Sequence, residues 1–182
     1  MEIRINRTLL WVAAALIVFG VVMRLLPHPA NLAPVGAIAL FGGAILPRRY
    51  GWWLPLAVLA VSDILFLGLY DGFAFTWLGF LLVGLFGMSL RSQNNWLRIP
   101  LGALGASVIF FAVSNFGVWL QGQMYPPTWA GLVQCYEMAL PFFRNTFLGD
   151  LLYSSVLFGA YALAVKLASQ TKLQNWQNKN LP

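Results

Sequence analysis

Residues 99–120 read IPLGALGASVIFFAVSNFGVWL and form the clearest membrane-spanning segment of the chain. This run is 22 residues long and contains no charged side chain. A helix needs about 20 apolar residues to cross the roughly 30 Å hydrocarbon core of a bilayer. The small residues at 102–106 let a neighbouring helix approach closely, as packing within a membrane requires. The stretch therefore predicts a transmembrane helix with one tightly packed face.

Five further segments share this apolar character, and the whole composition agrees with them. Of the 182 residues, 60% are hydrophobic and only 9% are charged, whereas soluble domains carry about 25% charged residues. The sequence predicts an all-α fold, a polytopic integral membrane helix bundle with six transmembrane helices, forming a single domain over residues 1–182. The other expected spans are residues 8–26, 30–46, 50–70, 73–90 and 145–168.

The basic residues are distributed unevenly between the two sides of these spans. Of the 11 Lys and Arg residues, nine fall on one side if both termini are cytoplasmic, and only Arg24 and Arg144 fall on the other. Short cytoplasmic loops carry such an excess, which predicts an N-in, C-in protein of the bacterial cytoplasmic membrane. The charge is spread over four segments and forms no basic stripe, so no nucleic-acid partner is expected. The nine are Arg4, Arg7, Arg48, Arg49, Arg91, Arg98, Lys166, Lys172 and Lys179.

The longest outer connection, residues 121–143, has a helical pattern of its own. The Pro-Pro pair at 126–127 breaks the chain, and apolar residues over 129–140 then recur on one helical face. This pattern predicts a short amphipathic helix lying on the outer surface between the fifth and sixth spans. Pro141 is expected to end or bend that helix.

Three polar side chains lie inside the predicted spans at similar depths. Counted from the outer ends at about 1.5 Å per residue, Asp63, Asn115 and Asp150 lie roughly 10 Å below the outer surface. A carboxylate in a membrane avoids lipid and turns toward the bundle interior, so we expect the three to converge. Aromatic residues near this level would complete a pocket with a few fixed polar groups, as is typical of small-molecule sites.

Each of these residues also has a purely structural interpretation. Asp63 or Asp150 can pair with Arg24 or Arg144 to hold the bundle together, and Asn115 can bond between helices. The aromatic residues can belong to an ordinary interfacial belt. No metal or other cofactor is predicted, because His28 and Cys135 are isolated and a metal needs several ligands at suitable spacing.

Several motifs that would indicate catalysis are absent from the sequence. It contains no GxxxxGK[ST], HExxH, CxxC or GxSxG pattern. The chain is therefore not expected to be an enzyme. The remaining catalytic alternative is that Asp63 or Asp150 acts as a general acid or base.

Three stretches carry a resemblance to known membrane families. Residues 31–51, NLAPVGAIALFGGAILPRRYG, resemble the second-span region of the substrate-binding S-components of energy-coupling-factor vitamin transporters. Residues 114–119, SNFGVW, and 141–153, PFFRNTFLGDLLY, resemble a related uncharacterised bacterial six-span family. The resemblance implies capture of a vitamin or similar small molecule from the outer side. It also implies docking on a membrane coupling subunit with ATPases, followed by inward release.

On this reading, the substrate-binding residues and the moving parts can be named. The helix at 128–140 would serve as a lid over the site. One feature departs from the family, because S-components commonly have an Ala-x-x-x-Ala docking pattern in the first span. That spacing is missing here, and Ala39 and Gly43 in the second span come closest to it. The expected substrate contacts are Asp63, Asn115, Trp119, Tyr136, Arg144 and Asp150.

The sequence leaves a second functional class open. The protein can instead be a structural or assembly subunit of a larger membrane complex. The small-residue faces of the second and fifth spans, together with the aromatic outer helix, would then be surfaces for partner proteins.

Overall fold

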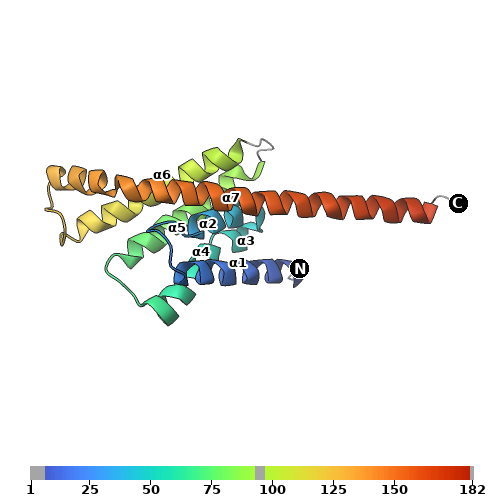
Figure 1. The fold of residues 1–182 in the computed structure, drawn as a ribbon, viewed down its shortest axis with the longest axis horizontal. Coiled ribbons are helices and arrows are strands. Elements are labelled where there is room, and N and C mark those ends of the chain that lie inside the picture. Colours follow the sequence, from blue (N-terminus) through green and yellow to red (C-terminus); the bar gives the residue numbers. More distant parts are fainter. Residues whose placement is uncertain (1–6, 93–96, 181–182) are drawn as a thin grey trace.

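The computed structural model describes residues 7–92 and 97–180, with side chains placed over 10–91 and 97–171. All regular elements in these ranges are helical, and they form an elongated bundle (Figure 1). Arg4 lies outside the described residues, and so do the side chains of Arg7, Lys172 and Lys179. The elements are α1 (Arg7–Leu25), α2 (Val35–Ile45), α3 (Arg48–Gly51), α4 (Leu54–Leu59), η1 (Ala60–Leu67), α5 (Phe73–Ser89), η2 (Leu90–Ser92), α6 (Arg98–Leu120) and α7 (Trp129–Asn180).

Helix α2 forms the centre of the bundle. Every residue from 35 to 44 is buried, and the helix packs against α4, α5, α6 and α7. Its 11 residues reach only about 16 Å, half of a hydrocarbon core. The predicted span over 30–46 was therefore too long. Prolines cannot donate the backbone hydrogen bonds of a helix, and Asn31 has the left-handed φ of 63°, so the chain before Pro34 is not helical.

Glycines let the central helices approach backbone to backbone. A Cβ atom added at Gly43 of α2 would overlap the carbonyl oxygen of Gly84 in α5. Likewise, a Cβ atom at Gly51 would overlap the carbonyl oxygen of Gly42. Small residues make such contacts possible in membrane bundles, where no hydrophobic force drives helices together. The small-residue face of the second predicted span is therefore interior, and it cannot serve as a partner surface.

The third predicted span, 50–70, corresponds to the helical segment Arg48–Leu67, whose hydrogen-bond pattern changes along its length. Its parts are α3, α4 and the π-helical segment η1, which ends where Gly68 adopts a φ of 81°. π-Helical turns are rare and occur frequently at functional sites. Asp63 lies in this segment and is fully buried.

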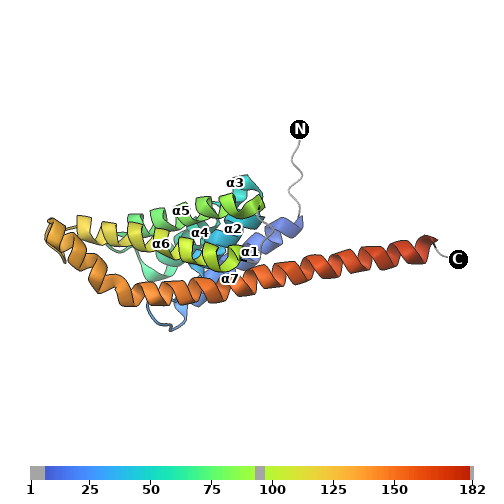
Figure 2. The same ribbon diagram turned by 90° about the horizontal axis from the view of Figure 1, so that it is seen from above.

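The C-terminal third of the chain is a single helix, which corrects two predictions. Helix α7 has 52 residues and is about 78 Å long, so 129–140 is not a separate surface helix and the last span does not begin at 145. Pro141 lies inside α7. A proline removes one helical hydrogen bond and bends a helix without necessarily ending it. Figure 2 shows the first part of α7 inclined to the remainder.

Helix α7 runs antiparallel to α6 along the full length of α6. Near one end, the Tyr136 hydroxyl donates a 2.6 Å hydrogen bond to the carbonyl oxygen of Ala112. Near the other end, the guanidinium carbon of Arg98 lies 5.6 Å from the centre of the Phe158 ring. Beyond this point residues 159–171 are all exposed, and α7 projects past the other helices (Figures 1 and 2).

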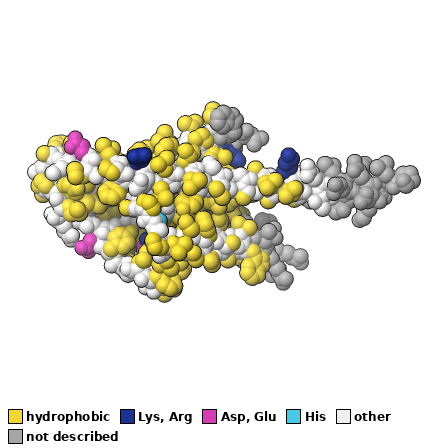
Figure 3. All heavy atoms as spheres, viewed as in Figure 1, with side chains coloured by type: hydrophobic (Ala, Val, Ile, Leu, Met, Phe, Trp, Pro, Cys, Tyr) yellow, Lys and Arg dark blue, Asp and Glu magenta, His cyan; other side chains and the backbone are white. Residues whose placement is uncertain are grey.

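Several helices have the length and the apolar composition of membrane spans. Three helical segments are long and apolar enough to cross a bilayer: Arg48–Leu67, Arg98–Leu120 and Trp129–Thr171. Shorter apolar helices lie at Leu10–Leu25, Val35–Ile45 and Phe73–Ser89. Hydrophobic side chains cover most of the face seen in Figure 3. The start of α1, helix α3, the start of α6 and the C-terminal part of α7 lie toward one end of the bundle, and the α6–α7 connection lies at the other (Figures 1 and 2).

Candidate functional site

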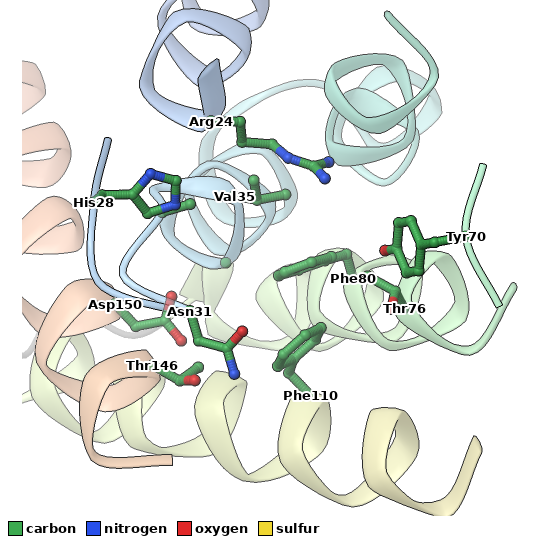
Figure 4. A pocket seen from close by; sticks show the side chains of 12 residues that line it. Arg24, His28, Asn31, Val35, Tyr70, Thr76, Phe80, Phe110, Thr146 and Asp150 are labelled. Atoms are coloured by element: carbon green, nitrogen blue, oxygen red, sulfur yellow. The ribbon is translucent and has the colours of Figure 1, made fainter. Parts of the chain in front are cut away.

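A partly open cavity of about 320 Å³ lies among α1, α2, α5, α6 and α7. In Figure 4, Asp150, Asn31 and Thr146 lie on one side of the cavity and Phe80 and Phe110 lie on the other, with Thr76 and Tyr70 beside Phe80. A volume near 300 Å³ is at the lower end of the range for small-molecule sites. The lining residues are Arg24, His28, Asn31, Ala33, Val35, Gly36, Tyr70, Thr76, Phe80, Phe110, Thr146 and Asp150.

Asp150 is the buried acid of the cavity. Its side chain is 3% exposed, and the Ser107 hydroxyl donates a 2.7 Å hydrogen bond to Oδ2. That hydroxyl has one proton, and the carbonyl oxygen of Ala103 at 2.9 Å competes for it. Among the described residues, no hydrogen bond to Oδ1 and no ion pair with Asp150 occur. Asp150 is therefore a buried carboxyl group with spare hydrogen-bonding capacity.

Gly36 leaves the space that the carboxyl group of Asp150 occupies. A Cβ atom at this position would overlap Asp150 Oδ1 and would lie 2.8 Å from Cγ. Because α2 is buried on all sides, it cannot move away to relieve such a contact. A glycine is thus required where the central helix faces the acid.

Asp63, the second buried acid, is fully paired. Arg24 Nη2 lies 2.6 Å from Asp63 Oδ1, the Trp77 indole nitrogen donates to Oδ2 at 2.9 Å, and Ser62 Oγ lies 3.3 Å from Oδ1. A buried carboxylate requires this kind of compensation by a cation and hydrogen-bond donors. Of the two interpretations, the structural ion pair with Arg24 is confirmed for Asp63. Arg24 also lines the cavity, and its Nη1 atom is buried without a hydrogen-bond partner in the described part of the chain.

The aromatic side of the cavity consists of a stacked pair. The rings of Phe80 in α5 and Phe110 in α6 have centroids 4.3 Å apart and an interplanar angle of 23°. Gly79, beside Phe80, has no side chain to separate them, and a Cβ there would come within 3.1 Å of the Phe110 ring. The pair presents a rigid apolar surface to the cavity.

The six residues predicted to contact substrate are dispersed. Only Asp150 lines the cavity, and Asp63 lies behind Arg24. Asn115 borders a separate cavity of about 300 Å³ that shares only Asn31 with the first. Trp119 Nε1 donates a hydrogen bond to the carbonyl oxygen of Pro126 at 3.1 Å, and the Tyr136 hydroxyl donates to the carbonyl oxygen of Ala112. Arg144 is exposed and has no polar partner among the described side chains.

The expectation that Asn115 and Asp150 share one depth was wrong. Asp150 contacts Ser107, which precedes Asn115 by eight residues on α6, or about 12 Å along the helix axis. The depth of Asp150 was counted from Arg144 as a helix end, but α7 begins at Trp129. The first turns of α7 lie beside α6, where Cys135 Sγ donates to the Asn115 carbonyl oxygen at 3.4 Å. These turns do not line the main cavity, so they are not its lid.

Sequence reasoning missed three residues that shape the site. Ser107 was hidden within a small-residue face, although a hydroxyl inside an apolar span is a detectable signal. Gly36 was assigned to general helix packing, and Trp77 was one aromatic residue among many. Ser107 lies 43 residues and Gly36 114 residues from Asp150, and Trp77 lies 14 residues from Asp63, so no local pattern indicates the contacts.

Metal-binding groupings do not occur in the part of the chain that the structure describes. No three His, Cys, Asp or Glu side chains come together there. Cys135 is buried, and the His28 ring lies with Nδ1 2.6 Å from the carbonyl oxygen of Leu26. This bond identifies Nδ1 as the protonated nitrogen, because a carbonyl oxygen can only accept.

Comparison with known proteins gives one match. No curated protein and no solved structure matches the chain. The model of DUF6580, described as a family of unknown function, matches residues 4–173. The matched range includes every residue that lines the cavity. The chain therefore belongs to the DUF6580 family.

Proposed function

We propose that this protein is the substrate-binding subunit of a membrane transport system and captures a small molecule in the cavity beside Asp150. The observation that carries the proposal is a nearly fully buried, unpaired acid in a partly open cavity of ligand size. Ionisable residues within membrane helices are costly and mark substrate or ion pathways. An acid with no cationic partner in the described structure has no evident stabilising role.

The proposed topology has six membrane segments and both termini in the cytoplasm of a bacterium. Support comes from the end of the bundle that gathers α3, with Arg48 and Arg49, and the start of α6, with Arg98. An excess of basic residues is typical of the cytoplasmic side. The short α2 would be one of the six segments, and it is shielded from lipid by the surrounding helices.

Under this topology the cavity would receive its ligand from the outer side. His28 and Asn31 lie in the α1–α2 connection, and Tyr70 lies between η1 and α5. Both connections would be on the outer side. The resemblance to S-components supports the same direction of capture, followed by docking on a membrane coupling subunit with ATPases. The docking surface would not involve Ala39 and Gly43, because both are buried.

Ligand retention tests the proposal directly. The full chain, purified and placed in lipid nanodiscs, is analysed by native mass spectrometry, and its thermal stability is measured with a panel of vitamins. We expect a retained or stabilising small molecule that Asp150→Ala loses. Asp71→Ala is the matched control, because Asp71 is an exposed acid whose Oδ2 accepts only a 3.3 Å hydrogen bond from Gln123. The proposal fails if nothing is retained or stabilising, or if both variants behave alike.

A second candidate is a structural subunit of a membrane complex, favoured by the exposed part of α7. The Tyr161 ring still packs edge-on against Phe41, but residues 162–171 are all exposed, and Leu163, Val165 and Leu167 are each more than half exposed. A helix that is apolar and unpartnered beyond the end of α6 is suited to contact another protein. Photo-crosslinking from position 163 in cells, with position 64 in η1 as a lipid-facing control, distinguishes this role. A discrete protein adduct from 163 alone would support it.

A further inference from the structure

We infer that the ligand of the cavity is a small organic ammonium compound, with its cationic nitrogen against Asp150 and an apolar or aromatic body against Phe80 and Phe110. This inference rests on the proposed function and assigns the chemical class of the substrate. It follows from three observations. Arg24 is paired with Asp63, the carboxylate of Asp150 can accept further hydrogen bonds, and Phe80 and Phe110 lie on the side of the cavity opposite Asp150.

The charge balance leaves one negative charge uncompensated. Arg24 and Asp63 form the ion pair of the site at 2.6 Å, so their charges cancel. Within the described part of the chain, Asp150 has only the hydroxyl of Ser107 as a polar partner. A buried carboxylate is stable when a cation pairs with it. His28 also lines the cavity, but no ion pair joins its ring to Asp150 among the described residues.

The carboxylate has room to accept further hydrogen bonds. Two carboxylate oxygens together offer about four acceptor positions, and Ser107 fills one of them. Oδ1 lies over Gly36, which contributes no side chain. Asn31 and Thr146 lie beside Asp150 in Figure 4, and each can bond a ligand N–H or an adjacent hydroxyl group. An ammonium group, with two or three N–H donors, matches this set of acceptors.

The opposite wall suits the body of such a molecule. The stacked rings of Phe80 and Phe110 provide an apolar surface against which an apolar or aromatic body can pack. An anionic ligand would instead face the carboxylate of Asp150 in a region of low dielectric, where like charges repel strongly. The site therefore discriminates by charge as well as by size.

Three probes of one size test the assignment: benzylamine, which is cationic at neutral pH, benzyl alcohol, which is neutral, and benzoate, which is anionic. Their binding to the full chain in nanodiscs is measured by ligand-observed NMR. We expect benzylamine to bind about tenfold or more tightly than benzyl alcohol, because both can donate a hydrogen bond to Asp150 but only the ammonium group also forms an ion pair with it. Benzoate should bind least. Asp150→Asn should abolish the preference for the amine, and Asp71→Asn should retain it.

A second variant keeps the inference testable if Asp150→Asn folds poorly. Ser107→Ala keeps the carboxylate of Asp150 and removes only its hydroxyl partner, so it should preserve the order in which the three probes bind. Equal binding of benzylamine and benzyl alcohol to the unmodified protein overturns the inference, because Asp150 would then be protonated. Stronger binding of benzoate overturns it as well. A retained neutral or anionic ligand that Asp150→Ala loses would refute the ammonium assignment and leave the proposed function intact.

Discussion

The contact between Gly36 and Asp150 gives the sharpest prediction about the packing of the site. In Gly36→Ala the new methyl group would overlap Oδ1 of Asp150 and approach Oδ2 to 2.9 Å. Either α2 or the acid must shift, and α2 is enclosed along residues 35–44. Overpacking of a close-packed interior costs typically 1–3 kcal/mol. We expect a loss of about 2 kcal/mol, which corresponds to a melting temperature lower by roughly 4–8 °C for a chain of this size.

A double-mutant cycle isolates this contact. Asp150→Ala removes the atoms that the new methyl group would meet, so Gly36→Ala should cost less than about 0.5 kcal/mol in that background. The assay is thermal unfolding of all four proteins in the same detergent. Gly149→Ala is the control, since the nearest atom to its added Cβ is Leu32 Cα at 3.5 Å, an ordinary contact. Equal destabilisation by Gly36→Ala in both backgrounds would refute the reasoning.

The remaining predictions concern the ion pair and the helix contacts. Arg24→Met leaves Asp63 as a buried, unpaired charge and should lower the free energy of unfolding by about 3–5 kcal/mol, measured by thermal unfolding. Adding Asp63→Asn should recover part of this loss, and the absence of any recovery would contradict the ion pair. Gly43→Ala should cost about 3 kcal/mol, because its Cβ would meet a backbone carbonyl group. Gly159→Ala, with no atom within 4 Å of its Cβ, should be neutral or stabilising by up to about 1 kcal/mol. A lower melting temperature for Gly159→Ala than for Gly43→Ala would contradict this prediction. Trp77→Phe removes a hydrogen bond to a carboxylate and should cost about 2 kcal/mol in thermal unfolding. An unchanged melting temperature would contradict it.

Helix positions were largely predictable because they depend on local hydrophobicity. The expected spans at 8–26, 73–90 and 99–120 agree with α1, α5 and α6 to within one residue at each end. Each lies between polar or glycine-rich segments that interrupt an apolar run. The fold class, all-helical with several helices able to cross a membrane, follows from the same signal.

The incorrect boundaries have a common physical cause, which is that tertiary contacts override local signals. Separate helices were expected at 129–140 and 145–168, yet α7 continues through both while packed against α6, and Pro141 lies inside it. The span at 30–46 was lengthened to cross a bilayer by itself, but α2 is buried among other helices and has no need to reach both surfaces. A length rule assumes a lipid-exposed helix, and α2 is not one.

The candidate site was partly predictable for a similar reason. Asp63 and Asp150 stand out because an acid in an apolar span must be buried and compensated. Asn115 and Trp119 share that polar or amphipathic character, but they lie at other cavities. The sequence provides the type of each side chain and its height on its own helix, and neither property specifies which helix lies opposite.

The sequence by itself determined that this chain is a bundle of apolar helices and that its few buried acids must turn inward. Hydrophobic burial and the cost of a charge in hydrocarbon are properties of each segment, so they can be read locally. Only the tertiary structure decided the fate of each acid. Asp63 meets Arg24 from a segment 39 residues earlier, whereas Asp150 meets a hydroxyl, a glycine and a cavity. An ion pair forms only where two charged groups come within a few ångströms of each other, so the packing of the helices determines which acid is paired with a cation and which keeps spare hydrogen-bonding capacity.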